Sequence, residues 1–90
     1  MSTRILETAS VSQSQANAGK TRHVRGGANV TSQIRSLAIA QIDSDPGFYL
    51  FYLDEQGKEL TDTYHESISM AREQAAFEFG LRDGDWVRAV

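Results

Sequence analysis

The stretch that decides the fold is GFYLFYLDEQGKELTDTYHESISMAREQAAFEFG, residues 47–80. Residues 48–53 are all aromatic or leucine, a composition favoured in β-strands. A tight turn is predicted at residues 55–58, where Gly57 can adopt the positive φ that such hairpins need. Residues 60–65 then form a more polar strand, suited to the edge of a sheet. The first half of this stretch therefore predicts an antiparallel hairpin.

The second half predicts a helix with both ends marked. Ser67 is placed as its N-cap, because a serine hydroxyl can accept a hydrogen bond from a free N–H of the first turn. Gly80 is placed as the left-handed residue that ends the helix. At the helical repeat, five apolar residues share the face expected to pack on the sheet: Ile68, Ala71, Ala75, Ala76 and Phe79.

Order is expected to begin near residue 34. Residues 34–42 contain four aliphatic side chains in nine positions without a breaker, which favours a buried strand, although a helix there stays open. Pro46 and Gly47 then end the segment with a turn. The predicted fold class is α+β: a three-stranded antiparallel sheet with one C-terminal helix packed on one face, β-β-β-α, spanning residues 34–90.

Residues 1–33 are predicted to form a flexible, disordered tail. They are rich in Ser, Thr, Gln, Asn, Ala and Gly, and such a segment buries too little apolar surface to offset the entropy lost on ordering. A short helix near residues 3–9 is the alternative. Residues 1–35 carry five basic residues and one acidic, whereas residues 36–90 carry four basic and eleven acidic, giving the total of −3. The folded unit is thus acidic and its tail mildly basic.

Composition limits the class of protein further. The chain has no cysteine, so disulfides and thiolate-ligated zinc are excluded. No apolar run approaches the roughly 20 residues of a membrane span. The first residues also lack the apolar core of a secretory signal, so we expect a cytoplasmic protein without membrane contact.

Residues 47–80 resemble a group of small, uncharacterised bacterial proteins. The resemblance is carried by GFYLFYLD, by DTYHES and by AREQAAFEFG, and covers about a third to a half of the chain. No activity is established for that group, so the resemblance implies a β-β-α fold and no mechanism.

Several motifs suggest chemistry without completing it. Gly19-Lys20-Thr21 matches the end of a phosphate-binding loop, but Ser14 stands where the loop needs its first glycine. His65 is the one acid–base candidate in the expected folded unit, and we expect it to fix the strand-to-helix junction through a backbone hydrogen bond. The Asp-rich segments 43–45 and 83–85 lack the ligand run of a calcium loop and are interpreted as turns. We therefore predict no enzyme, no catalytic residue, no cofactor and no metal.

One helix can cover only one face of a sheet, so an aromatic stripe should stay uncovered. That stripe is either Phe48, Leu50 and Tyr52 or Tyr49, Phe51 and Leu53. The predicted protein-interface residues are Tyr49, Phe51, Leu53, Met70 and Phe77. We expect a small interaction module that forms a homodimer or binds a protein partner, with an acidic inhibitor or immunity-type protein as one form. The alternative, considered the weaker one, is nucleic-acid binding through the basic tail, residues Lys20, Arg22, Arg25 and Arg35.

Overall fold

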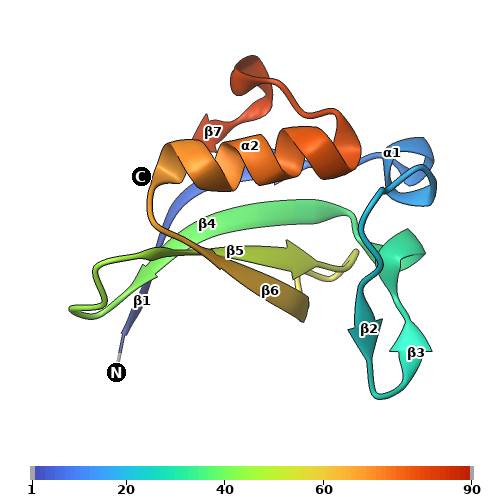
Figure 1. Ribbon diagram of the computed structural model, residues 1–90, viewed down its shortest axis with the longest axis horizontal. Helices are drawn as coiled ribbons and strands as arrows, with labels where there is room; N and C mark the ends of the chain where they lie inside the picture. The colour runs from blue at the N-terminus through green and yellow to red at the C-terminus, as the bar shows by residue number, and fades with distance from the viewer. Residues whose placement is uncertain (1, 90) are drawn as a thin grey trace.

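The computed structural model describes residues 2–89 as one sheet, one long helix and a small two-stranded arm (Figure 1). The elements are β1 (Thr3–Ser10), α1 (Gln13–Asn17), β2 (Val24–Arg25), β3 (Ala28–Asn29), η1 (Thr31–Gln33), β4 (Ser36–Ile42), β5 (Phe48–Leu53), β6 (Glu59–His65), α2 (Ile68–Phe79), η2 (Asp83–Asp85) and β7 (Val87–Arg88).

The main sheet has five strands in the order β6-β5-β4-β1-β7, and every neighbouring pair is antiparallel. The prediction of a three-stranded sheet is therefore wrong. Its three strands are real: β4, β5 and β6 form the expected meander, residues 34–42 are extended rather than helical, and β6 lies at an edge. The expectation failed because β1 and β7 pair beyond β4, which makes β4 the central strand.

The N-terminal segment is part of the fold, so the predicted disordered tail is also wrong. β1 pairs with β4 from Thr3↔Ile42 to Ser10↔Ser36, with a bulge between Ile5 and Glu7. The possible helix over residues 3–9 is replaced by this strand. The core takes in four residues from the expected tail: Ala9, Val11, Ala16 and Val30. These small side chains bury little area each, but the pairing of β1 satisfies one whole side of β4.

α2 lies across one face of the sheet (Figure 1). Its predicted ends are confirmed: the Ser67 hydroxyl accepts from the Met70 N–H at 3.1 Å, and Gly80 has φ 71°. Ala71, Ala75 and Phe79 are buried in the core, while Ala76, which was expected there, is exposed. The covered sheet face consists of Leu37, Ile39, Leu50 and Tyr52, with Phe48 partly buried beside them.

Both edges of the sheet are short or occupied. β7 is two residues long and follows the buried Trp86. At the opposite edge, the Arg25 guanidinium from β2 donates to the carbonyls of Glu59 and Leu60 in β6, at 3.0 and 3.1 Å. The β2–β3 arm is thereby fixed to the start of β6. Within residues 2–89 no helix is long and apolar enough to cross a membrane.

Candidate functional site

The sheet face opposite α2 is predominantly apolar. Because side chains alternate along a strand, the register places Tyr49, Phe51 and Leu53 of β5 on this face, beside Ala38 and Ala40 of β4. A solvated face of an antiparallel sheet normally carries polar residues at such positions. We call this surface, which further includes Ile5, Thr8, Ser36, Asp62, Tyr64 and Val87, the open face.

Three aromatic rings form a ridge on the open face. The Tyr49 ring is stacked 6.0 Å from Phe51 and meets Tyr64 edge-on at 5.0 Å, measured between centroids. Asp45 accepts from the Tyr64 hydroxyl at 2.6 Å and from the Tyr49 hydroxyl at 3.3 Å. The hydrogen bond from Tyr64, with those from the Gly47 N–H and Tyr49, holds the pKa of the Asp45 carboxyl below its usual range. The rings are thus held in place before any partner arrives.

Two small residues of β4 lie beside this ridge. Ala38 and Ala40 are 2% and 0% exposed, so their neighbours on the sheet already cover them. Ile5 and Val87, on the far side of these alanines, are 40% and 65% exposed. On the edge strand β6, the register places two carboxylates on this face, since Asp62 pairs with Phe51 and Glu59 with Leu53. The open face therefore combines an aromatic ridge and exposed aliphatic side chains with acidic residues along β6.

The five predicted interface residues do not share one surface. Tyr49, Phe51 and Leu53 are partly buried on the open face, as the alternation predicted. Met70 and Phe77 are 47% and 59% exposed on α2, on the other side of the sheet. Any partner of the open face therefore leaves these two side chains untouched.

A buried polar network ties the N-terminal segment to α2. His23 Nε2 lies 2.6 Å from Glu78 Oε1, and the Tyr52 hydroxyl and the Gln74 amide donate to Glu78 Oε2. His23 Nδ1 also lies 2.8 Å from the Thr61 hydroxyl. Since an ionised carboxylate only accepts hydrogen bonds, His23 donates from Nε2. Three donors thus converge on a glutamate that is 2% exposed.

This network sets the ionisation of its members. Burial alone would raise the pKa of the Glu78 carboxyl, but hydrogen bonds from His23, Tyr52 and Gln74 outweigh it and lower that pKa. Burial, followed by the hydrogen bond to Glu78, raises the pKa of the Tyr52 hydroxyl well above its usual range. Glu78 therefore stays ionised inside the protein, with a satisfied partner at every buried side-chain polar atom that the structure describes.

This network was not predicted from the sequence, because its members are far apart in the chain. His23 lies in the segment expected to be disordered, 55 positions from Glu78. The one local signal was Glu78 itself, which lies between Phe77 and Phe79 near the apolar side of the predicted helix. A carboxylate so placed needs a buried donor, but nothing in the sequence names that donor.

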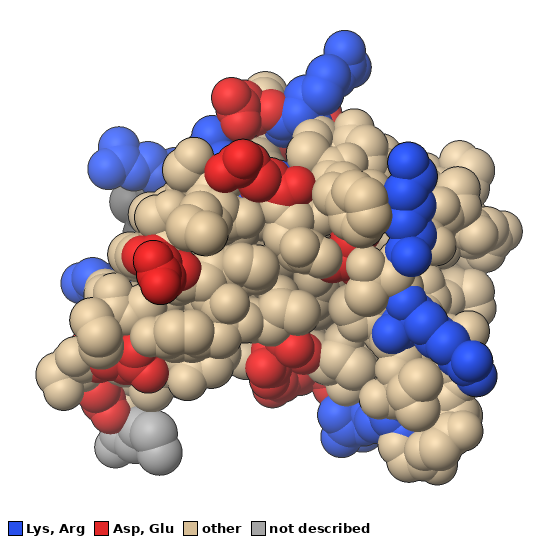
Figure 2. Space-filling model, viewed as in Figure 1, with Lys and Arg blue, Asp and Glu red and all other residues tan. Residues whose placement is uncertain are grey.

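The network orients the connection between α1 and β2. Thr21 and His23 face inward, whereas Lys20, Arg22 and Val24 are exposed. Lys and Arg side chains gather along the side of the molecule where this connection and the arm lie, while much of the acidic charge in this view lies elsewhere (Figures 1 and 2). Arg35, predicted to join them, instead donates to the carbonyls of Ser32 and Ile34, both at 2.8 Å, and to Gln13.

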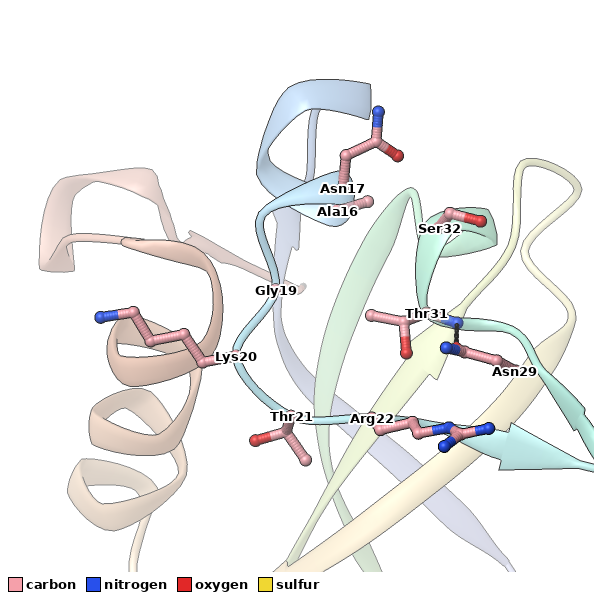
Figure 3. A pocket seen from close by; sticks show the side chains of 9 residues that line it. All are labelled: Ala16, Asn17, Gly19, Lys20, Thr21, Arg22, Asn29, Thr31 and Ser32. Atoms are coloured by element: carbon pink, nitrogen blue, oxygen red, sulfur yellow. Dashed lines mark hydrogen bonds between the residues drawn. The ribbon is translucent and has the colours of Figure 1, made fainter.

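Two hollows flank Lys20. The first, of about 500 Å³, is lined by Ala16, Asn17, Gly19, Lys20, Thr21, Arg22, Asn29, Thr31 and Ser32. Figure 3 shows the Lys20 side chain leaving this hollow and pointing toward α2. The second, of about 330 Å³, lies on that side and is lined by Lys20, Phe77, Gly80 and neighbours. The Gly19-Lys20-Thr21 motif is thus a bent, irregular connection, without the strand–loop–helix frame of a phosphate-binding loop.

The remaining candidates are structural. His65 Nε2 lies 2.8 Å from the Thr63 hydroxyl, a side-chain partner rather than the expected backbone group, and burial lowers its pKa. Residues 43–45 and 83–85 form a turn and the short helix η2. Across residues 2–89 there is no group of three or more His, Asp or Glu able to hold a metal ion.

Comparison of the chain with protein-family models, with curated proteins and with solved structures finds no match.

Proposed function

We propose that this protein is a small interaction module that forms a homodimer through its open face. The observation that carries this proposal is the aromatic ridge of Tyr49, Phe51 and Tyr64, which lies on the sheet face that α2 leaves bare. Large contiguous apolar patches on soluble proteins mark sites of association. Tyr64 is 49% exposed even though its hydroxyl is bound to Asp45.

The shape of the open face fits a second copy of itself. A two-fold interface uses the same patch on both subunits, so that patch must be self-complementary. The aromatic and aliphatic side chains on the open face of one protomer can pack against those of the other. Two sheets packed in this way stand about 10 Å apart, the spacing of a β-sandwich.

No segment within residues 2–89 takes the partner's place. The N-terminal segment extends the sheet sideways as β1 and leaves the ridge uncovered. Aromatic residues such as those of the ridge are enriched in protein–protein interfaces.

The test is sedimentation equilibrium of the wild-type chain and of Phe51→Thr. Threonine keeps the β-strand preference while removing the ring, so the sheet should persist. We expect a monomer–dimer equilibrium for the wild type, weakened at least tenfold by the substitution, as for an aromatic residue at the centre of an interface.

Phe77→Ala is the control on the helix side, since it also removes a phenylalanine ring but away from the open face. It should leave the dimerisation constant unchanged. A wild type that sediments as a monomer up to about 1 mM, where Kd would correspond to about −4 kcal/mol, would overturn the proposal. Equal loss of association in both variants would place the interface away from the open face.

A further inference from the structure

We infer that the side of the molecule formed by Lys20, Arg22 and Phe77 binds single-stranded nucleic acid. This surface is separate from the open face and from the proposed dimer. It differs from the basic tail considered in the sequence, because Arg35 is withdrawn into hydrogen bonds with the Ser32 and Ile34 carbonyls and a helix residue, Phe77, is brought in.

The two cations lie on a segment that the buried network holds in place. His23 is buried and Thr21 half-buried, while Lys20 and Arg22 are exposed. Figure 3 shows Lys20 pointing toward α2 and Arg22 pointing toward the β2–β3 arm, so the two charges lie on either side of the connection. His23 holds that segment against α2 through Glu78, which fixes the spacing without using either cation.

The aromatic residue missing from the sequence pattern is supplied by α2. Residues 20–27 contain no Phe, Tyr or Trp, whereas proteins that bind single strands stack the bases on such side chains. In the structure Lys20 Nζ lies 5.7 Å from the centroid of the Phe77 ring, and that ring is 59% exposed. A base can therefore stack on Phe77 while its phosphate reaches Lys20.

Two adjoining hollows extend this surface, and we call the extended surface the track. One hollow is lined by Lys20 and Phe77, the other by Lys20 and Arg22, so Lys20 is shared by both. Asn17, Asn29 and Ser32 line the larger hollow, that of Lys20 and Arg22, and supply donors and acceptors of the kind that bases recognise. Along the track, the Phe77 ring comes first, followed by Lys20 and Arg22 and then by the hollow lined with Asn17, Asn29 and Ser32.

Charge and shape favour a single strand over a duplex or an acidic peptide. Glu78 beneath the track is buried and paired, so the nearby carboxylate does not repel phosphate at the surface. Two free cations are few for a duplex, whose bases are also stacked out of reach of Phe77. An acidic peptide would pair with Lys20 and Arg22 but would provide no base to stack on the Phe77 ring.

The test is fluorescence anisotropy with a labelled eight-nucleotide oligothymidylate at low salt. Contact with two phosphates predicts a slope of log K against log salt of about −1.4 for a single strand. Arg22→Gln should reduce the slope to about −0.7. Phe77→Leu should weaken binding about tenfold without changing the slope, because it removes stacking and no charge.

Arg88→Gln is the matched charge control, because Arg88 is exposed on β7, at the sheet edge opposite the β2–β3 arm. It should bind as the wild type does. The inference is overturned by no binding at about 20 mM salt, by Arg22→Gln and Phe77→Leu that bind like the wild type, or by equal binding to the matching duplex. Equal competition by polyglutamate would assign the surface to acidic peptides instead. Phe51→Thr serves to separate the proposals, since it should leave this binding intact.

Discussion

At the scale of single residues, Glu78 is the most consequential side chain in the protein. It joins three segments, since His23 comes from the N-terminal connection, Tyr52 from β5 and Gln74 from α2 itself. A buried carboxylate without such donors would be strongly destabilising. Here it fixes which part of the connection meets the helix, and so it orients Lys20 and Arg22 as well.

Glu78→Gln should destabilise the fold by about 1–3 kcal/mol at pH 7, because a charged acceptor is replaced by an amide that also brings unmatched donors. Urea unfolding followed by tryptophan fluorescence measures this. Glu73→Gln, an exposed change on the same helix, should have no effect. A Glu78→Gln protein as stable as the wild type would mean that the network is not formed in solution.

The same residue predicts an acid dependence of stability. The folded pKa of Glu78 lies below its usual value, so the native state binds this proton less readily than the unfolded state does. The stabilisation is present above the ordinary carboxyl range and is lost as pH falls through the folded pKa. The difference in unfolding free energy between wild type and Glu78→Gln should therefore shrink between pH 7 and pH 3. A difference in unfolding free energy that stays constant between pH 7 and pH 3 would contradict this prediction.

At the scale of elements, the sequence predicted those whose signals are local. β5 has the predicted bounds and β6 begins one residue early, because their strand residues and turns are adjacent in the chain. α2 was found from Ser67 and Gly80. β1 was missed because TRILETAS has few apolar residues, and its stability comes from pairing with β4 more than 25 residues away.

The same reasoning explains how much of the candidate surfaces was foreseen. Alternation along β5 was enough to place Tyr49, Phe51 and Leu53 on one face. The juxtaposition of Lys20 with Phe77 could not be predicted, since it requires the connection after α1 to lie against the end of α2. Interactions across 57 positions leave no periodicity in a single sequence.

Ser67→Ala tests the boundary of α2. The N-cap hydroxyl satisfies a backbone N–H that has no partner within the helix, so its loss should cost about 1 kcal/mol. Thermal unfolding followed by circular dichroism measures the change. Ser69→Ala, exposed within the first turn, is the control and should be neutral or slightly stabilising because alanine has the higher helix propensity. Equal effects would show that the cap contributes nothing.

At the scale of the whole molecule, the N-terminal segment distinguishes this fold from the one expected. Glu7 of β1 receives two hydrogen bonds from the Arg72 guanidinium of α2, at 2.9 and 2.8 Å. β1 also provides the partner strand of β7. Sheet and helix are thus connected through a strand that composition alone assigned to a flexible tail.

Deleting residues 1–10 should therefore abolish cooperative unfolding rather than remove a tail. It would leave one side of β4 unpaired, leave β7 without its partner and uncover the core side of Leu37. Urea titration and hydrogen exchange measure the outcome. A truncated chain that unfolds at the wild-type midpoint would show that β1 is dispensable.

The clamp of Arg25 on the Glu59 and Leu60 carbonyls has a consequence for assembly. Exposed strand edges can recruit further strands without limit and so nucleate filaments. At one edge of this sheet the Arg25 guanidinium occupies two carbonyls of β6, and at the other edge β7 is only two residues long. Both features disfavour growth of the sheet, edge to edge, into open-ended polymers.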